Sequence, residues 1–326
     1  MYVRRKHRKL KHHPSFEDDF EILEAAAQRS SKMANCRQGP CTASELWSWP
    51  RSLVSCMSAE EGDRVDALLS EGSQHTTDYS GFDCPRSMMA TITKALCERS
   101  PKLNAAEHKF IRSCDNNALA QSILCSYAQD LDSDTTCVFG GLESSMDQEH
   151  KDMLDSLEPS KSLRKMKDPE AVAECVTAYE NLTQHVWSEK EVHYPRHAVS
   201  PCLVHGGAGC PLFKQRFSPL SLSFNWAGTI CKGWSTVGAQ QRFGDPSERP
   251  HASWVAQRHQ AAKFNTEDLF MQECTKNYPW ILKLVLPLRA THHIVSVISD
   301  PRKVFGFPSK RPRRYSAGLA LERPCE

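Results

Sequence analysis

The sequence predicts a doubly wound α/β fold built on a mostly parallel sheet. Strand-like apolar segments alternate with segments of helical spacing from His75 to about residue 320. A glycine turn joins the first strand to the first helix, as in nucleotide-binding α/β units, and its residues are Tyr79, Ser80, Gly81 and Phe82. The length of 326 residues is enough for one large domain of this class or for two smaller ones.

The composition and charge of the chain exclude few classes of function. Lys and Arg total 41 against 39 for Asp and Glu, and the basic residues cluster in Arg4–His13 and Lys310–Arg314. A polyanionic partner is compatible with these clusters but is not required by them. No apolar segment follows Met1 and no stretch approaches the length of a membrane helix. We therefore expect no membrane association and expect the 14 cysteines to be reduced, inside the cell.

The sequence predicts a poorly ordered basic N-terminal region at residues 1–70, followed by a catalytic domain at 71–326. This first segment is basic, then acidic, then contains Ser, Gly and Cys without apolar periodicity. Its basic run matches a nuclear-import signal or a loose nucleic-acid-binding arm. A solvated tail explains the same residues equally well.

Two strand–helix units open the predicted domain. A short strand ends at Gly81, and Arg86–Cys97 has helical apolar spacing after Pro85, which suits a first helical turn. His108–Asp115 reads as the second strand and 116–125, beginning with Asn116, as its helix. An acid at the tip of the second strand is placed to accept both ribose hydroxyls of an adenosyl group. A helix N-cap is the alternative role for Asp115.

A third strand, Thr136–Phe139, is followed by Gly140 and Gly141 and by a helical insertion at about 143–215. Cys202, His205 and Cys210 in this insertion offer three metal ligands. A zinc site needs a fourth, and the sequence shows none. An ordinary loop is therefore favoured, and no metal site is predicted.

The central motif follows the fourth strand, Leu222–Trp226. A tight turn at Gly228 leaves Cys231 on a loop at the carboxyl end of that strand, the edge where α/β sheets bind ligands. Small residues such as Gly228 and Gly233 would let a substrate approach the sulfur. This position suits a nucleophile, and a buried structural cysteine is the alternative.

The remaining elements continue the alternation. Glu273 lies near the end of the next strand, so we expect it at the same sheet edge as Cys231. The predicted segments are a helix at Ser247–Arg258, a strand at Asp268–Cys274, a helix at Pro279–Leu288, and strands at His293–Ile298 and Arg314–Ala320.

In this order the motifs resemble those of the cytosine-5 methyltransferases, which act on DNA or, in one branch, on tRNA. The resemblance covers roughly residues 75–320 and is greatest to divergent members from dinoflagellates and other protists. It rests on Tyr79–Phe82 as the cofactor turn, Asp115 as the ribose acid, Gly228–Ser235 as the nucleophile loop, Gln272–Thr275 as the acidic segment and Pro308–Tyr315 as the arginine segment.

The resemblance implies S-adenosylmethionine as cofactor, DNA as substrate with RNA as the alternative, and a nuclear location. Cys231 would add to C6 of cytosine, Glu273 would act at N3, and Arg311 or Arg313 would hold O2 and favour the thiolate. The implied cofactor-binding residues are Tyr79, Ser80, Gly81, Phe82, Asp115, Asn116 and Gly228.

The sequence also departs from the family pattern. Ile230 replaces the proline before the nucleophile, Cys274 replaces the asparagine after the acid, and the third strand ends in glycines where an aspartate is expected. The resemblance leads us to expect a target-recognition region after the arginine segment, and the sequence up to Glu326 shows no such region. An inactive or fragmentary homologue that binds cofactor or nucleic acid, and a metal-stabilised cysteine-rich protein, therefore stay open, as does the oligomeric state.

Overall fold

The computed structural model describes residues 50–131, 136–144, 146, 148–157, 194–235, 241–300 and 311–321, with five single residues between 170 and 181. The chain divides into two units. One comprises Met1–Leu46 and Asp300–Arg311, and the other comprises Trp47–Ser299 and Pro312–Glu326. The sheet and the site belong to the second unit. The basic run at 4–13 lies outside the described residues.

A seven-stranded sheet with the order β3-β2-β1-β6-β7-β9-β8 forms the centre of the second unit. Its strands are β1 (Ser73–Asp78), β2 (His108–Cys114), β3 (Cys137–Phe139), β6 (Leu222–Gly228), β7 (Leu269–Thr275), β8 (His292–Ser299) and β9 (Arg313–Ala320). Neighbouring strands pair in parallel from β3 through β2, β1 and β6 to β7. Strand β9 runs antiparallel to both β7 and β8. Strand order therefore reverses between β1 and β6. This arrangement is the Rossmann-like fold of S-adenosylmethionine-dependent methyltransferases, so the predicted fold class is confirmed.

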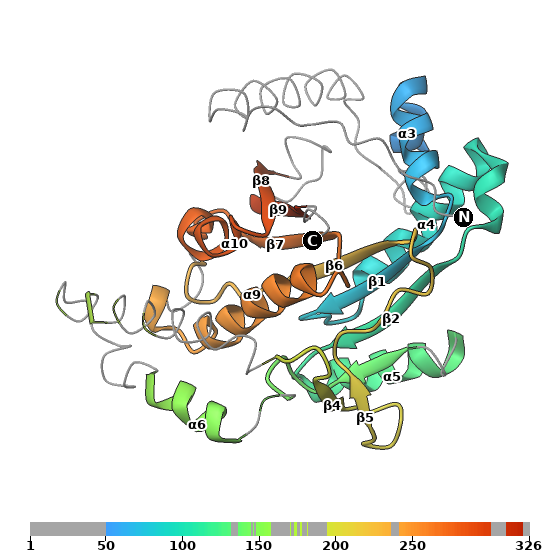
Figure 1. Cartoon of the computed structure of the whole chain (residues 1–326). Helices are drawn as coiled ribbons and strands as arrows, with labels where there is room; N and C mark the ends of the chain where they lie inside the picture. Colours follow the sequence, from blue (N-terminus) through green and yellow to red (C-terminus); the bar gives the residue numbers. More distant parts are fainter. Residues whose placement is uncertain are drawn as a thin grey trace. The chain divides into compact units, whose positions relative to one another are not determined.

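Helices cover both faces of the sheet. The helices of this unit are α3 (Ala59–Leu69), α4 (Cys84–Arg99), α5 (Ala118–Leu131), α6 (Gln148–Leu157), α9 (Glu248–Lys263) and α10 (Leu286–Leu288). Short 3-10 helices lie at Pro101–Ala105 and Arg242–Gly244, and a π-helical turn at Ile281–Val285 leads into α10. Right-handed crossovers in opposite directions from the sheet centre place α4 and α9 on opposite faces. Figure 1 shows α9 crossing the near face of the sheet, with α4 behind it.

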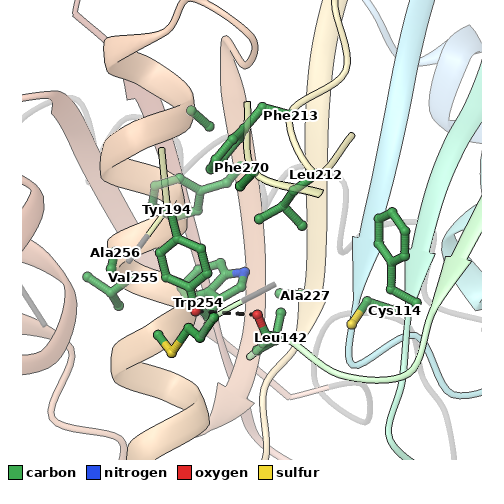
Figure 2. Close-up of a cluster of buried hydrophobic side chains, with 14 of the residues drawn as sticks. Cys114, Leu142, Tyr194, Leu212, Phe213, Ala227, Trp254, Val255, Ala256 and Phe270 are labelled. Atoms are coloured by element: carbon green, nitrogen blue, oxygen red, sulfur yellow. Dashed lines mark hydrogen bonds between the residues drawn. The ribbon is translucent and has the colours of Figure 1, made fainter. Parts of the chain in front are cut away.

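The main apolar core lies between α9 and the sheet. Trp254 of α9 is fully buried and meets the ring of Phe270 on β7 edge-on, with 5.5 Å between ring centroids. Figure 2 shows these side chains together with Tyr194, whose hydroxyl donates a hydrogen bond to the Leu142 carbonyl at 3.3 Å. The end of the insertion is thus part of this core.

Helix α3 lies within the segment 1–70, where the sequence indicates little order. A capping box starts it, because the Ser58 hydroxyl accepts from the Glu61 N–H and the Glu61 carboxylate accepts from the Ser58 N–H. Leu69 then packs in a second core cluster with Leu96 of α4. These tertiary contacts help to order this part of the chain. The boundary between a poorly ordered region at 1–70 and a domain at 71–326 stays a prediction in other respects.

The predicted helical insertion is helical only in part. Helix α6 is followed, beyond residues 158–193 that lie largely outside the described part, by a hairpin of β4 (Val199–Pro201) and β5 (Gly209–Pro211). Three-residue strands are too short to give a periodic signal in sequence. Among the helices that the structure describes, none has the length and apolar character needed to cross a membrane.

Candidate functional site

A pocket of about 500 Å³ opens at the carboxyl ends of the parallel strands. Its walls include Tyr79 after β1, Asp115 and Asn116 after β2, Gly140 and Gly141 after β3, and Ile230 after β6. This is the point where strand order reverses, the position at which open α/β sheets bind their ligands. The topology therefore makes this pocket the candidate ligand site.

The turn between β1 and α4 has an unusual backbone. Tyr79, Gly81 and Asp83 all have positive φ angles, of 53°, 51° and 54°. A Cβ atom on Gly81 would meet no atom within 4 Å, so the chain surface there is open. The buried Ser80 hydroxyl fastens the turn to β2, donating to the Cys114 carbonyl at 3.0 Å and accepting from the Cys114 N–H at 3.1 Å. Left-handed non-glycine residues are costly, and they concentrate at functional sites.

Asp115 links this turn to the end of β2. Its Oδ2 accepts from the Gly81 N–H at 2.8 Å and its Oδ1 accepts from the Asn117 N–H at 2.8 Å. The side chain that caps α5 is Asn117, whose Oδ1 accepts from the N–H groups of Leu119 and Ala120. The N-cap alternative for Asp115 is therefore wrong. Each carboxylate oxygen keeps a lone pair that can accept from a ligand hydroxyl.

Tyr79 brings an unpaired polar atom to the pocket. Its hydroxyl is buried and has no hydrogen-bond partner among the described residues. Burial, followed by the nearby Asp78 carboxylate, raises the pKa of Tyr79 far above its usual value, so the phenol stays protonated. A buried hydroxyl without a partner is costly unless a bound group or water completes its hydrogen bonding. The Tyr79 hydroxyl is thus suited to bind a polar group of a ligand.

Glu143 also lines the pocket, although it is not among the site residues predicted from the sequence. Its carboxylate accepts from the Arg249 Nε at 2.9 Å and from the Ser253 hydroxyl at 3.1 Å, both on α9. The family pattern has an acid directly after the third strand, where this chain has Gly140 and Gly141. Glu143 is the first acid beyond those glycines, and that is the only sequence signal that could have indicated it.

Cys231 lies where the sequence predicts it, on the loop that leaves the carboxyl end of β6. The loop begins with Thr229, whose N–H donates to the Glu273 carbonyl at 3.1 Å. The carbonyl of Cys231 then accepts from the N–H groups of Trp234 and Ser235 at 3.1 and 2.8 Å, which closes a tight turn. Cys231 is half-buried and does not itself line the pocket, whereas its neighbour Ile230 does.

Contacts behind the loop hold it in place. The indole N–H of Trp234 donates to the buried Glu248 carboxylate at 3.0 Å, and the ammonium of Lys283 lies 2.5 Å from the same carboxylate. Burial raises the pKa of Glu248, and Lys283 opposes that shift. This pair anchors the loop of Cys231 to α9 and to the segment before α10.

Gly233 serves packing rather than substrate access, contrary to the sequence-based prediction. A Cβ atom there would come within 2.7 Å of the Asp245 side chain and 2.8 Å of the Arg242 carbonyl. The Gly233 carbonyl accepts a hydrogen bond from the Arg242 N–H at 2.9 Å. Only glycine lets these two segments approach so closely. Residues 236–240, including Gly238, lie outside the described part of the chain.

Glu273 and Arg313 form an ion pair near the cysteine loop. Glu273 pairs with Gly228 across β6 and β7, and its Oε1 lies 2.7 Å from the Nε of Arg313 at the start of β9. The Glu273 side chain is 37% exposed, so solvent reaches the pair. Arg311 is exposed and belongs to the other unit of the chain. Within the second unit, Arg313 therefore meets the acid.

The seven predicted cofactor residues divide into two groups. Tyr79, Asp115 and Asn116 line the pocket. The other four do not: Ser80 and Gly81 shape the turn, Gly228 is the exposed end of β6, and Phe82 is 59% exposed. Phe82 follows a positive-φ glycine in the turn and is the predicted cofactor contact that this structure supports least.

No protein-family model and no curated protein matches the chain. Among solved structures it is similar to the Entamoeba histolytica methyltransferase EhMeth, with 13% identity, a TM-score of 0.34 and coverage of 78% of this chain and 55% of that one. It is also similar to the S. pombe Dnmt2 methyltransferase, with 10% identity, a TM-score of 0.35 and coverage of 78% and 53%.

A third similar structure is the delta-N METTL16 MTase domain, with 8% identity, a TM-score of 0.33 and coverage of 94% and 98%. The chain thus spans about half the length of the first two structures. The fold assignment rests on the order and direction of the strands.

Proposed function

We propose that this chain is an S-adenosylmethionine-dependent cytosine-5 methyltransferase that acts on DNA in the nucleus. One observation carries the proposal. The pocket at the reversal of strand order is lined by Tyr79 and Asp115, and its wall residue Ile230 is directly followed by Cys231. The ion pair of Glu273 and Arg313 lies at the same sheet edge.

The pocket residues suit S-adenosylmethionine. The Asp115 carboxylate can accept from ribose hydroxyls, and the unpaired Tyr79 hydroxyl can complete its hydrogen bonding with a polar group of the ligand. Gly141 leaves its part of the wall open, because a Cβ atom there would meet nothing within 4 Å. The volume of about 500 Å³ lies within the usual range for small-molecule sites. When bound, this cofactor supplies an electrophilic methyl group.

The chemistry assigned to the chain's own residues begins at Cys231. Its thiolate would form a bond to C6 of cytosine, which makes the poorly nucleophilic C5 reactive. Glu273 would hydrogen-bond N3 and stabilise the charge that builds on the ring, and Arg313 would orient Glu273 and hold O2. Once C5 carries the methyl group, loss of the C5 proton and cleavage of the bond between sulfur and C6 restore the base and the thiolate.

DNA is the proposed partner, and RNA is the alternative substrate that the experiment distinguishes. The two basic clusters of the sequence support a polyanionic partner, although most of their residues lie outside the described part of the chain. A cytosine in a duplex must leave the base stack to reach a thiol in this position.

The test is transfer of labelled methyl from S-adenosylmethionine to duplex DNA and to tRNA in parallel. We expect label in DNA with the wild type and with Cys56→Ser, which removes an exposed thiol in the segment before α3. We expect none with Cys231→Ser, because serine oxygen is a far weaker nucleophile than thiolate. DNA containing 5-fluorocytosine should trap the wild type covalently, since fluorine prevents the loss that releases Cys231.

Other outcomes are equally informative. Label in tRNA alone would move the substrate class to RNA. Full turnover by Cys231→Ser would remove Cys231 as the nucleophile. No label with the wild type on either substrate, with cofactor still bound, would contradict the enzyme and favour a binding module.

A second prediction concerns the cofactor acid. Asp115→Ala should weaken binding of S-adenosylhomocysteine by about 1–3 kcal/mol, because hydrogen bonds to a charged group are lost. Titration calorimetry measures the change, with Asp152→Ala on α6 as a control. Thermal unfolding must be compared in parallel, since Asp115 also holds the Gly81 and Asn117 N–H groups. Unchanged affinity would exclude Asp115 from the site.

A further inference from the structure

Four potential metal ligands converge at the edge of the sheet away from the cysteine loop. They are Cys137 on β3, Cys202 and His205 in the insertion, and Cys210 on β5, and their ligand atoms all lie within 4.8 Å of one another. The sulfur atoms of Cys202, Cys210 and Cys137 lie 3.1, 3.3 and 3.7 Å from the Nδ1 of His205. The fourth ligand missing from the sequence analysis is thus Cys137, which precedes His205 by 68 residues.

These spacings match a tetrahedral zinc site. With Zn–S bonds of about 2.3 Å and a Zn–N bond of about 2.0–2.1 Å, the ligand atoms of a tetrahedron lie about 3.5–3.8 Å apart. The distance of 3.7 Å from Cys137 to His205 falls in that range, whereas those of 3.1 and 3.3 Å from Cys202 and Cys210 are shorter, so the ligands of a bound ion would move apart by less than about 0.5 Å. Three cysteines and one histidine form one of the usual structural zinc sets, and soft thiolate ligands favour zinc over magnesium or calcium.

The backbone holds the ligands independently of any ion. The loop from Cys202 closes on itself, because the Cys202 N–H donates to the Ala208 carbonyl at 3.0 Å and the Gly207 N–H donates to the Cys202 carbonyl at 2.8 Å. Positive φ angles of 62° at Gly206 and 82° at Gly207 allow this tight path. Hairpin pairing then sets Cys210 opposite Ser200.

The loop is also fixed against β3. The Leu203 N–H donates to the Val138 carbonyl at 2.9 Å, and Cys202 forms an antiparallel bridge with Phe139. Cys137, the neighbour of Val138, is therefore brought to the loop by main-chain contacts. The ligand cluster follows from the fold and not from chance rotamers of exposed side chains.

The sulfur atoms of this cluster gather around one atom of the histidine ring. Cys137 and Cys202 are almost fully buried, yet all three sulfur atoms share the single Nδ1 of His205. One ring nitrogen donates one proton or offers one lone pair, so it cannot serve three thiols by itself. Main-chain groups of His205 and Val204 also hydrogen-bond to Cys202, as they would to a thiolate. A metal ion bonded to all four atoms would satisfy them together. Lys214 lies beside the Cys137 sulfur, where its ammonium would offset the net negative charge of three thiolates around Zn²⁺.

We propose that Cys137, Cys202, His205 and Cys210 bind one Zn²⁺ ion in a closed structural site. Four protein ligands leave no open position for a substrate, so the ion stabilises structure rather than acting in catalysis. It would fasten the β4–β5 hairpin to β3, directly before Gly140 and Gly141 in the pocket wall. The sequence-based prediction of no metal site rested on a missing fourth ligand, and Cys137 supplies that ligand from a distant part of the chain.

Metal analysis of the full-length chain, purified under reducing conditions, tests the proposal. We expect one zinc per chain in the wild type, loss of zinc in Cys210→Ser and His205→Ala, and full zinc in Cys56→Ser. His205→Cys should retain the metal, because four cysteines are also a good zinc set. Replacement of zinc by Co²⁺ should give the absorption of a tetrahedral cobalt–thiolate centre.

A second measurement covers the case in which the ligand variants do not fold. In the wild type, a chelator should release zinc and make three thiols newly reactive toward a thiol reagent, and added zinc should protect them again. A wild type without metal that takes up neither Zn²⁺ nor Co²⁺ after reduction would overturn the proposal. So would a disulfide between Cys202 and Cys210 in protein that retains its fold.

Discussion

At the scale of single residues, the centre of the sheet is unusually polar, and His75 shows how the polarity is accommodated. Its ring lies between those of Phe110 and Phe224, with centroids 4.8 and 5.1 Å away. The Trp226 indole N–H donates to Nδ1 at 3.1 Å, so Nε2 carries the proton and lies 2.7 Å from the Ser73 hydroxyl. Both ring nitrogens are thus satisfied in the neutral form. Burial lowers the pKa of His75 to about 3.

This residue should contribute to acid sensitivity. The histidine titrates near 6.5 when unfolded and near 3 when folded, so between these values the unfolded state binds one proton more. The free energy of unfolding should therefore fall as pH drops below 6.5, by up to about 1.4 kcal/mol per pH unit from His75. His75→Phe should retain the stacking of the rings. The free energy of unfolding of this variant should fall less steeply with decreasing pH, because unfolding takes up one proton fewer.

Denaturant unfolding at pH 5, 6 and 7 measures the difference, with the exposed His197→Ala as control. The variant should also be less stable at pH 7 by about 1–3 kcal/mol, because the indole N–H of Trp226 loses its acceptor. If the free energy of unfolding of His75→Phe fell between pH 7 and pH 5 as steeply as that of the wild type, His75 would not titrate as proposed.

At the scale of elements, the contact between β9 and β7 depends on one glycine. Gly318 pairs with the fully buried Phe270, and a Cβ atom on Gly318 would come within 2.1 Å of the Phe270 ring. The strand can approach this ring only without a side chain at that position. The ring in turn packs against Trp254 of α9, so the fit of β9 affects the core as a whole.

Gly318→Ala should destabilise the fold by about 1–3 kcal/mol through overpacking. Phe270→Leu makes room beside position 318, so the double variant should lose less stability than the sum of the two single changes. Chemical denaturation of all four proteins gives the coupling free energy. Strictly additive losses would mean that the alanine is accommodated by movement elsewhere in the sheet.

At the scale of the whole second unit, buried charges join the two halves of the sheet below the pocket. Arg112 on β2 donates to both carboxylate oxygens of Asp78 on β1, at 2.8 and 2.9 Å, and Asn225 on β6 donates to the same carboxylate at 2.7 Å. Arg258 of α9 meets Glu267 at 2.8 Å, where burial raises the pKa of Glu267 to about 7. Buried pairs of this kind add little net stability but are costly to break singly. They fix how β1 meets β6, the strands that flank the reversal point.

Most of the secondary structure and the placement of Cys231 could be predicted from local patterns in the sequence. The predicted strand His108–Asp115 corresponds to β2, and the predicted helix Ser247–Arg258 corresponds to the first part of α9. Apolar periodicity records which side chains face the interior, and glycine records where the backbone turns. Both signals are local, so they can be found without knowing which distant segments meet.

Tertiary structure alone decided which distant residues come together. It brought Cys137 to the loop of Cys202, placed Glu143 in the pocket, and paired Arg313 with Glu273. It also made a strand of buried polar residues at the sheet centre, because each finds partners on neighbouring strands. Such contacts depend on strand order and register, which no local pattern of side chains contains.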